Sequence, residues 1–429
     1  MQDFSCTFIV WKELDIRSEV IDVIFKLNED IFFVKGYTNG AIYDLKLNQI
    51  YSINARACDI LQKIISGLDL EDDIEKNYKN ILKQKFNLNA NYKIVAISKD
   101  YFKNRELSLD LLWLEITQAC NLKCVHCYEG EIHKHCVNGL DTSKWYDIVE
   151  QAKEIGVKNL VVIGGEPCLH KDINGIITKI VENNLHATIV TNATVMSTSL
   201  MDLIIENKEK ISVKVSIYGP NASVHENVTK VKGSFDKLVK NVKYLTTNGV
   251  KVLSAVVAMK ENQDYLEETK SFIKNLGMIY TRYDVIRNVF GGTQKLHIPT
   301  NKYVIKQCQY TKPLFSPSRE KFYRNQYENS CWNGKLVITE TGDILPCVFD
   351  RNNIIGNICR NNLREIIESD EVKRCWFMPF DDIMVCKDCE YRFACKDCRP
   401  LAKSVDGCQN GKNPRCKYDP YTGNWNKEG

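Results

Sequence analysis

The stretch Cys120-Asn-Leu-Lys-Cys124-Val-His-Cys127-Tyr128 places three thiols and an aromatic ring on nine consecutive residues. It follows a β-type run, Leu111–Thr117, so we expect the thiols just beyond the carboxyl end of a strand, where α/β proteins carry their ligand-binding loops. Three ligands are one fewer than a [4Fe–4S] cluster or a tetrahedral zinc ion requires. A cluster bound in this way keeps one open iron, and catalysis at a cluster needs that opening.

Zinc is the alternative metal for the same three thiols. Its fourth ligand would come from a nearby side chain, and the candidates are His126, His133, His135 and Cys136. On spacing alone, zinc is the less favoured of the two metals. Otherwise we expect the histidines, His126 included, to pack or to face solvent.

Strands and helices alternate outward from this stretch. The β-type runs are 111–117, 160–163, 187–191, 211–217, 250–257 and 280–286, and helical patterns such as 142–155 and 235–247 separate them. Such alternation predicts a parallel α/β unit. The segment 108–298 is too short for an eight-stranded barrel, so the prediction is a partial (β/α)6 barrel.

A second motif, Gly164-Gly165-Glu166-Pro167, ends the second of these strands. Paired glycines let the backbone approach a ligand closely, and a carboxylate can pair with an ammonium group. Alone, the motif would describe a turn. Next to a CxxxCxxC loop on the preceding strand, it indicates a binding site.

Composition excludes several classes of protein. The chain is 44% hydrophobic and 26% charged, as soluble globular proteins are, and its net charge of +4 excludes a strongly basic nucleic-acid binder. There is no apolar run of about 18 residues and no basic stretch followed by an apolar one at the N-terminus. We therefore expect a cytoplasmic protein without nucleic-acid or membrane partners.

The 18 cysteines are unevenly distributed, with five between residues 120 and 168, none from 169 to 307, and eleven from 308 onward. Without an export signal, metal binding is favoured over disulfides. Four cysteines are expected to be small buried hydrophobic residues: Cys6, Cys58, Cys359 and Cys375. Cys136 and Cys168 lie beside the two motifs, and a hydrogen-donor role is the minor alternative for each.

The last hundred residues, 331–429, carry ten cysteines and little periodicity, so metal is expected to organise them. A pair of zinc ribbons and a pair of iron–sulfur clusters both suit CxxC spacing. The upstream triad favours clusters. Residues 299–330, with three prolines, are predicted to be a linker.

Residues 1–100 predict a small winged-helix-like module, with short β-type runs at 31–34, 40–45 and 50–53 followed by two helices. Residues 1–105 hold 15 basic and 15 acidic residues, and a neutral module is a poor DNA reader. An exposed third strand could instead accept a peptide as an added strand. A purely structural N-terminal domain is the alternative.

The cysteine loop, with Tyr128 after its last thiol, and the Gly-Gly-Glu-Pro turn together resemble the radical S-adenosylmethionine (SAM) superfamily over about 108–290. The resemblance implies that Cys120, Cys124 and Cys127 bind three irons of a [4Fe–4S] cluster, while SAM binds the fourth. The implied SAM contacts are Tyr128, Gly164, Gly165, Glu166, Thr191, Asn192 and Ser216, with Glu166 accepting from the SAM amino group. The implied chemistry is one-electron cleavage of SAM to a 5′-deoxyadenosyl radical, which removes a substrate hydrogen.

The C-terminal cysteines look like the SPASM extension of radical SAM peptide maturases, which binds up to two auxiliary [4Fe–4S] clusters. By correspondence, the first auxiliary cluster takes Cys331, Cys347 and Cys398, and the second takes Cys386, Cys389, Cys395 and Cys416. The family's middle motif commonly ends CxxxC, whereas this one ends Cys395-x2-Cys398, which leaves the sorting open. Cys408 competes with Cys416, and either Cys308 or a substrate thiolate would complete the first cluster.

The first hundred residues look like the PqqD-like precursor-recognition module, in which a leader peptide adds beside the third strand, here Gln49–Ile53, and against the helix beginning near Ala55. The resemblance as a whole implies a sactipeptide- or ranthipeptide-like maturase that forms cysteine thioether cross-links in a ribosomally synthesised precursor, with a flavodoxin- or ferredoxin-type electron donor. Alternatives are carbon–carbon or carbon–oxygen cross-linking, epimerisation, a sulfatase-maturase-like activity, and a metal-stabilised winged-helix regulator without turnover.

Overall fold

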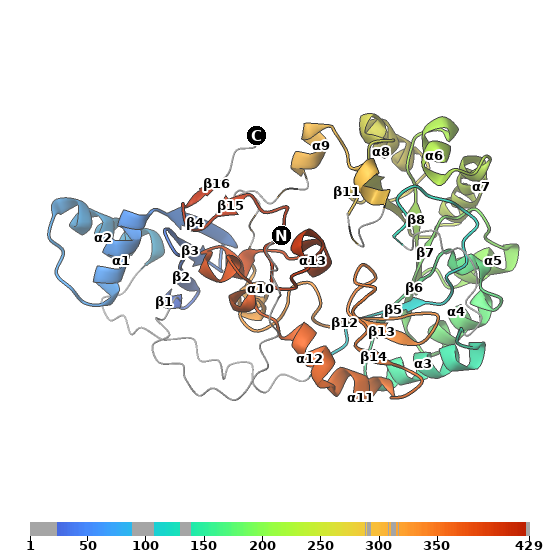
Figure 1. Cartoon of the computed structure of the whole chain (residues 1–429), viewed down its shortest axis with the longest axis horizontal. Coiled ribbons are helices and arrows are strands. Elements are labelled where there is room, and N and C mark those ends of the chain that lie inside the picture. The colour runs from blue at the N-terminus through green and yellow to red at the C-terminus, as the bar shows by residue number, and fades with distance from the viewer. Residues whose placement is uncertain are drawn as a thin grey trace, which may run out of the picture. The chain divides into compact units, whose positions relative to one another are not determined.

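The computed structural model describes residues 24–87, 107–128, 139–287, 289, 293–307, 309, 315 and 317–425 (Figure 1). The predictions for Cys6, His133, His135, Cys136 and Cys308 lie outside these residues. The chain divides into two compact units. We call residues 106–309 and 332–376 the central unit, and residues 1–105, 310–331 and 377–429 the terminal unit.

The central unit is built on an eight-stranded sheet of order β14-β13-β12-β5-β6-β7-β8-β9. Five parallel strands come from the predicted run: β5 Leu111–Glu115, β6 Asn159–Ile163, β7 His186–Thr191, β8 Ile211–Ser216 and β9 Val252–Ala255. The predicted sixth strand is a short one, β11 Asp284–Val285, which pairs in parallel with β10 Val257–Ala258. The run 250–257 therefore divides into two strands that belong to different sheets.

The sheet is mixed rather than wholly parallel, because the C-terminal half of the chain extends it beyond β5. Strand β12 Lys335–Ile338 pairs in parallel with β5, and β13 Asp343–Leu345 and β14 Gly356–Asn357 follow in antiparallel fashion. The sequence pattern predicts that the segment from 331 onward forms a domain of its own. Hydrogen bonding to the exposed edge of β5 instead brings its first part into the central unit.

Helices cover the parallel strands, as Figure 1 shows. They are α3 Thr142–Glu154, α4 Ile173–Glu182, α5 Thr198–Glu206, α6 Ala222–Thr229, α7 Ser234–Thr247 and α8 Leu266–Asn275, with the short α9 Lys302–Gln307 after them. Four of them begin at a residue whose side chain accepts a backbone N–H of the first turn: Asp141, Asp172, Ser197 and Asn221. Their apolar stripes, such as Ile176, Ile177 and Ile180 of α4, are buried against the strands.

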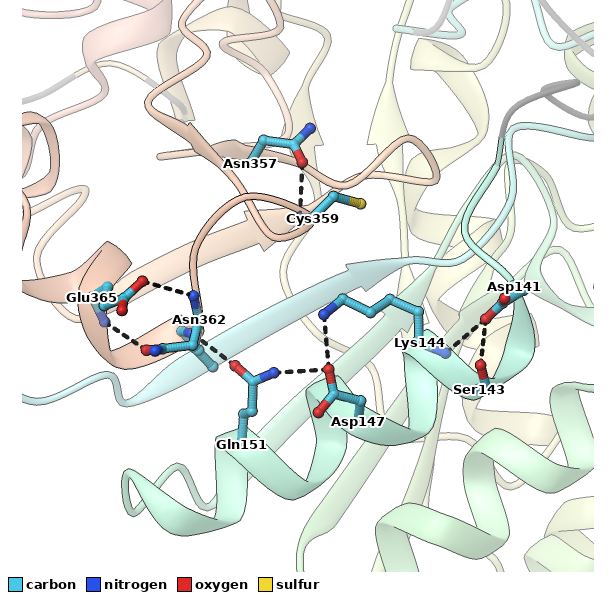
Figure 2. A network of polar contacts seen from close by, with 10 residues as sticks. Asp141, Ser143, Lys144, Asp147, Gln151, Asn357, Cys359, Asn362 and Glu365 are labelled. Atoms are coloured by element: carbon cyan, nitrogen blue, oxygen red, sulfur yellow. Dashed lines mark hydrogen bonds and ion pairs between the residues drawn. The ribbon is translucent and has the colours of Figure 1, made fainter.

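A polar network attaches the segment 332–376 to α3 (Figure 2). Gln151 Oε1 accepts the backbone N–H of Leu363 at 2.7 Å, and its Nε2 donates to Asp147 at 2.9 Å. Leu363 begins α11 Leu363–Glu368, which starts with a capping box between Asn362 and Glu365 and is followed by α12 Asp370–Trp376. The amide of Gln151 therefore satisfies one of the unpaired N–H groups at the start of α11.

The terminal unit begins with a four-stranded antiparallel meander of β1 Ile24–Asn28, β2 Ile31–Lys35, β3 Gly40–Asp44 and β4 Gln49–Ile53. Three strands were predicted, and β1 is an addition at the edge opposite β4. Helices α1 Ala55–Ile65 and α2 Asp73–Phe86 pack on one face of the sheet through Leu61 and Leu82. The likeness to a winged helix stays a prediction.

C-terminal residues cover the other face of this meander. Phe322, Tyr391 and Phe393 pack there against Phe32 and Tyr43. Their elements are α10 Arg319–Arg324, the single-turn segments Phe380–Asp382, Cys386–Asp388 and Arg392–Ala394, α13 Arg399–Asp406, and the pair β15 Tyr418–Asp419 and β16 Asn424–Trp425. The meander is thus the middle layer of the terminal unit. Among the described residues, no helix has the length and apolar character needed to cross a bilayer.

Replacement of Phe322 tests whether α10, which lies in the segment predicted as a linker, is part of the terminal unit's core. Its ring is fully buried, with centroids 4.8 Å from Phe32 and 5.0 Å from Tyr43. We expect Phe322→Ala to lower the free energy of unfolding by about 3–5 kcal/mol, because it removes a buried ring and leaves a cavity. Urea titration of the full chain measures this. Tyr303→Ala, at an 82% exposed position of α9, is the control, and a loss of similar size there would contradict the assignment.

Candidate cofactor site

The cysteine loop after β5 is fixed to the end of α6 by two backbone hydrogen bonds. The N–H of Lys123 donates to Thr229 O at 3.0 Å, and the N–H of Val125 donates to Val228 O at 3.1 Å. Cys120, Cys124 and Cys127 are all partly buried on this loop. The backbone positions of the thiols are therefore set by a neighbouring helix as well as by the strand.

The three thiols lie close enough to influence one another. Burial raises the pKa of Cys124, and the neighbouring thiols of Cys127 and Cys120 raise it further. Burial also raises the pKa of Cys120. Thiols in such surroundings stay protonated until a cation compensates the thiolate charge, so their ionisation is coupled to metal binding.

The donor set fits an iron–sulfur cluster. Within the described part of the chain, no three His, Cys, Asp or Glu side chains surround a single point as ligands of one ion would. A cluster binds each thiolate at a different iron, so its ligands need not converge on one atom. Three soft sulfur donors on one loop match that requirement.

The paired glycines of the second motif lie against the backbone that leads into the cysteine loop. Gly165 N–H donates to Thr117 O at 2.8 Å, and Glu166 N–H donates to Ala119 O at 2.7 Å. A Cβ on Gly164 would lie 2.2 Å from Thr117 O, and one on Gly165 would lie 2.4 Å from Gln118 O. Only glycine permits this approach. The sequence predicted close approach to a ligand, and the structure shows close approach to backbone.

Glu166 is fully buried and joins the loops that follow β6 and β7. Its carboxylate accepts the hydroxyl of Thr191 at 2.6 Å, the N–H of Asn192 at 2.7 Å and the N–H of Cys168 at 3.1 Å. Burial raises the pKa of this carboxyl, and the hydrogen bonds oppose that rise. A carboxylate offers about four acceptor positions, so Glu166 can accept a further donor such as an ammonium group.

Asn121 and Thr194, which no sequence motif singles out, connect this network to the cysteine loop. Asn121 Oδ1 accepts from Asn192 Nδ2 at 3.0 Å, and Asn121 Nδ2 donates to Thr194 Oγ1 at 2.8 Å. Ala193 between them has a positive φ of 57°. No spacing rule in the sequence announces these contacts, because they join loops more than seventy residues apart.

An aromatic cluster lies beside the thiols at the end of β8. The ring of Tyr218 stacks on His225 at 5.5 Å and meets the edge of His126 at 4.8 Å. Burial raises the pKa of the Tyr218 phenol, and a hydrogen bond with Ser216 opposes the rise. Burial lowers the pKa of His126 to about 4, so this histidine packs as a neutral ring within the cysteine loop.

One face of the sheet carries Tyr128 together with the Cys347 segment. Tyr128, Cys347 and Phe349 all pack against the apolar cluster that contains Val161 and Ile163. The Tyr128 and Phe349 rings lie 5.3 Å apart. Tyr128 thus lies on the same apolar wall as one of the cysteines predicted to bind an auxiliary cluster.

Two polar contacts add to this connection. Glu115 of β5, fully buried, forms a bidentate ion pair with Arg351, in which Nη2 donates to Oε1 at 2.9 Å and Nη1 donates to Oε2. The N–H of Gln118 donates to Glu340 Oε2 at 2.6 Å. Both contacts begin within five residues of Cys120 and end within seven residues of Cys347.

A second group of thiols gathers in the terminal unit. Burial raises the pKa values of Cys386, Cys389, Cys395 and Cys416, and Coulomb interaction with other thiols of this group raises those of the first three further. These are the four cysteines that the family resemblance assigned to one auxiliary cluster, and their sorting stays a prediction.

Two buried arginines support this cysteine-rich segment. Arg392 Nη1 donates to Cys389 O at 2.8 Å, and Arg399 Nη1 donates to Gln409 O at 2.8 Å. Arg399 also forms an ion pair with Asp397. The segment between the cysteines is thus ordered by charged hydrogen bonds to backbone oxygens, in addition to the apolar cluster that contains Tyr391 and Phe393.

The remaining cysteines are placed as follows. Cys331 and Cys398 lie in the terminal unit and Cys347 in the central unit, so their common cluster stays a prediction. Cys58 and Cys375 are buried, as predicted, whereas Cys359 is exposed. The prediction for Cys359 was wrong because the residue lies in the turn after β14, where its N–H donates to the side chain of Asn357 (Figure 2).

Two family profiles match the chain. The radical SAM superfamily matches residues 114–273, and an iron–sulfur cluster-binding domain named SPASM matches residues 331–399. The described site agrees with both, since the cysteine loop and the Gly-Gly-Glu turn lie in the first segment and six of the predicted auxiliary ligands lie in the second.

Curated relatives fall into more than one functional class. The antilisterial bacteriocin subtilosin biosynthesis protein AlbA of Bacillus subtilis is 25% identical over 271 residues, which are 61% of this chain and 60% of AlbA. An AdoMet-dependent heme synthase of Methanosarcina barkeri is 25% identical over 340 residues, which are 72% of this chain and 97% of that enzyme. The match therefore spans less than two thirds of AlbA.

Among solved structures, SuiB of Streptococcus suis bound to its precursor peptide SuiA aligns with a TM-score of 0.58 and 18% identity. The alignment covers 92% of this chain and all of the SuiB chain. At this identity the likeness concerns the fold, and it extends over both units.

Replacement of Gly164 tests whether the cysteine loop depends on the close backbone approach. Because a Cβ would overlap Thr117 O, we expect Gly164→Ala to displace the segment that precedes Cys120. Iron bound after anaerobic reconstitution should then fall by the share of one cluster. In Gly356→Ala the new Cβ would be 3.7 Å from its nearest neighbour, and this control should keep its iron. Full iron loading of Gly164→Ala would refute the argument.

The Glu115–Arg351 pair allows a second measurement. Glu115→Gln removes the carboxylate charge that the largely buried guanidinium of Arg351 pairs with, and we expect the free energy of unfolding to fall by about 3–5 kcal/mol. The double variant Glu115→Gln/Arg351→Met removes both charges and should regain most of this loss in the same urea titration. If the double variant is no more stable than Glu115→Gln, the two side chains are not energetically coupled.

Proposed function

We propose that this chain, a radical SAM enzyme that carries an iron–sulfur SPASM domain, modifies a ribosomally synthesised precursor peptide by forming cysteine thioether cross-links. SAM and [4Fe–4S] clusters are its cofactors. The observation that carries the peptide assignment is the edge strand β4, which belongs to a sheet outside the radical SAM segment. We infer from it that the leader of the precursor binds the terminal unit.

Strand β4 has the properties of a docking edge. It pairs with β3 on one side, and among the described residues no strand pairs with its other side. Its residues are partly exposed, with Tyr51 and Ile53 packed at the margin of the core below α1 and α2. An extended peptide can add its backbone hydrogen bonds to such an edge, and side-chain pockets beside the strand then give specificity.

The cofactors supply a 5′-deoxyadenosyl radical, formed when SAM accepts one electron. The chain's own residues hold the reactants. Cys120, Cys124 and Cys127 would bind three irons, and the carboxylate of Glu166 would accept the SAM amino group. The networks of Glu166 with Thr191 and of Asn121 with Asn192 connect the three loops that would surround SAM.

The wall beside the cysteine loop suits radical chemistry because it is apolar and buried. Val161 and Ile163 belong to it, and Tyr128, which follows Cys127, packs against it together with Phe349. Such a wall excludes water, which keeps a reactive intermediate from side reactions. A peptide segment held against it would present its carbon–hydrogen bonds to the radical.

Thioether formation balances as follows. A carbon–hydrogen bond of the peptide and the sulfur–hydrogen bond of a cysteine break, and one carbon–sulfur bond forms. The carbon-bound hydrogen would pass to the deoxyadenosyl group, and the thiol would lose its proton to solvent. Clusters held by the C-terminal cysteines would accept the remaining electron. The peptide therefore loses two hydrogen atoms for each bridge.

The relatives keep other reactions open to test. AlbA takes part in bacteriocin biosynthesis by its name, whereas the Methanosarcina barkeri relative is a heme synthase. The heme synthase match covers 72% of this chain and nearly all of that enzyme. A heme-synthase-like activity would therefore need only that part of the chain and no leader-binding module. Epimerisation and carbon–carbon or carbon–oxygen cross-links differ from thioethers in hydrogen balance or in thiol loss.

The test is anaerobic incubation of the reconstituted full chain with SAM, dithionite and a cysteine-containing peptide encoded beside its gene. We expect 5′-deoxyadenosine, loss of two hydrogen atoms per bridge, and loss of one titratable thiol per bridge. Cys120→Ala should abolish 5′-deoxyadenosine, whereas Cys359→Ala, at an exposed cysteine outside every predicted ligand set, should keep it.

Three outcomes would contradict the proposal in different ways. A peptide of unchanged mass that takes up deuterium from heavy water would indicate epimerisation. Loss of hydrogen with all thiols retained would indicate a carbon–carbon or carbon–oxygen bond. Equal modification of the precursor and of the same peptide without its leader would remove the role assigned to β4.

A further inference from the structure

Six exposed lysines form one basic surface next to the cysteine loop, which we call the lysine face. They are Lys123, Lys230, Lys232, Lys237, Lys240 and Lys243. Lys123 belongs to the cysteine loop itself, the next two follow α6, and the last three lie one turn apart on α7. Each is accessible to a partner in solution.

Backbone hydrogen bonds and helix packing bring together the segments that carry these lysines. The N–H of Lys123 donates to Thr229 O, directly before Lys230. Helices α6 and α7 are consecutive and pack on each other (Figure 1). On α7, Asn241 Nδ2 donates at 2.8 Å to the carbonyl of Ala193, whose loop is bonded to the cysteine loop through Asn121. The segment that follows α6 is therefore bonded to the cysteine loop directly, and α7 is linked to it through the loop of Ala193.

The charge of this face is not neutralised within the chain. Among the described residues, none of the six lysines forms an ion pair with a carboxylate. In contrast, Lys144 of α3 and Lys179 of α4 pair with Asp147 and Glu150. The segment 222–247 holds two carboxylates, and the Oε1 atom of one, Glu226, accepts the N–H of Gly233 at 2.8 Å.

The lysine face is thus a local concentration of charge on a nearly neutral chain. Its six lysines, the two carboxylates of 222–247 and Asp202, which accepts the hydroxyl of Tyr244 of α7 at 3.3 Å, give a net charge of +3, whereas the entire chain has +4. A patch of this kind attracts an acidic partner and speeds its encounter, with the effect decreasing as salt increases. Outside this face, basic and acidic residues are nearly equal in number. A long polyanion would therefore find few further cations to bind.

The position of the face indicates what its partner delivers. Cys124 follows Lys123 directly, and the three thiols are partly buried rather than deep inside the unit. A carrier bound over the lysines would lie next to the loop that holds the cluster ligands. The proposed reaction consumes an electron at that loop, and a partner that supplies it must approach the loop from the surface.

We propose that the lysine face is the docking surface for a small acidic one-electron carrier protein of the flavodoxin kind. This inference rests on the proposed function, because the electron has a use only if SAM is cleaved. The carrier would lose one electron, and the cluster that Cys120, Cys124 and Cys127 would hold would gain it. Recognition is by charge complementarity between the six lysines and carboxylates around the carrier's flavin.

Charge reversal tests the docking surface directly. In Lys232→Glu/Lys237→Glu, neither changed side chain contacts the cysteine loop in the described structure, and a glutamate at 237 suits the first turn of α7. We expect the dissociation constant for oxidised flavodoxin, measured by calorimetry on the reconstituted full chain at low salt, to rise about tenfold or more. The concentration of reduced flavodoxin that gives half-maximal 5′-deoxyadenosine formation should rise by a similar factor.

The control changes the same charges at the other end of the sheet. Lys153 lies in the last turn of α3 and Lys158 directly precedes β6, so both are at the amino ends of the strands, away from the cysteine loop. Both are exposed. Lys153→Glu/Lys158→Glu should bind flavodoxin within about twofold of the unaltered chain.

Dithionite separates this inference from the proposed function, because a small reductant needs no docking surface. With dithionite, Lys232→Glu/Lys237→Glu should form 5′-deoxyadenosine at the unaltered rate. Unchanged flavodoxin binding in this variant, or an equal loss with dithionite, would overturn the docking assignment. If the unaltered chain makes no 5′-deoxyadenosine with dithionite, the proposed function fails, and the calorimetric comparison still decides whether the lysine face binds the carrier.

Discussion

The candidate site depends on a close approach between two pieces of backbone. Gly164 and Gly165 lie so near Thr117 and Gln118 that a methyl group on either glycine would overlap a carbonyl oxygen. This approach lets two backbone N–H groups hold the segment that leads into the cysteine loop. The orientation of the three thiols therefore depends on the absence of two side chains forty residues away, and the carboxylate of Glu166 then joins the same turn to the next strand.

A second constraint connects this loop to the C-terminal half of the chain. Strand β12 pairs with β5, and the buried ion pair of Glu115 with Arg351 lies at the end of that pairing. Charged groups in such a place are costly unless they are matched, so the pair specifies one arrangement of the Cys347 segment against β5. The SPASM match therefore does not coincide with one compact unit, because its first part completes the sheet of the radical SAM segment.

Much of this organisation was accessible from local patterns. Strands such as 111–117 and 187–191 were predicted because short β-type runs alternate along the chain with helical patterns. The cysteine spacing identified the loop and its chemistry. Local patterns did not predict three features: the strand β1 of the meander, the division of 250–257 into two strands, and the exposure of Cys359. Each depends on which neighbour a short segment meets, and a five-residue strand or a turn carries too little periodicity to specify that neighbour.

The sequence by itself determined the types of ligand, their spacing on one loop, and the order of strands along the chain, because these follow from covalent connectivity and from side-chain chemistry. Tertiary structure decided which distant groups meet: Glu166 with Thr191, Asn121 with Asn192, and Arg351 with Glu115. It also placed Lys123 beside Lys230, more than a hundred residues later. The reason is that these contacts arise from strand pairing and helix packing across the sheet, whose register local spacing does not encode.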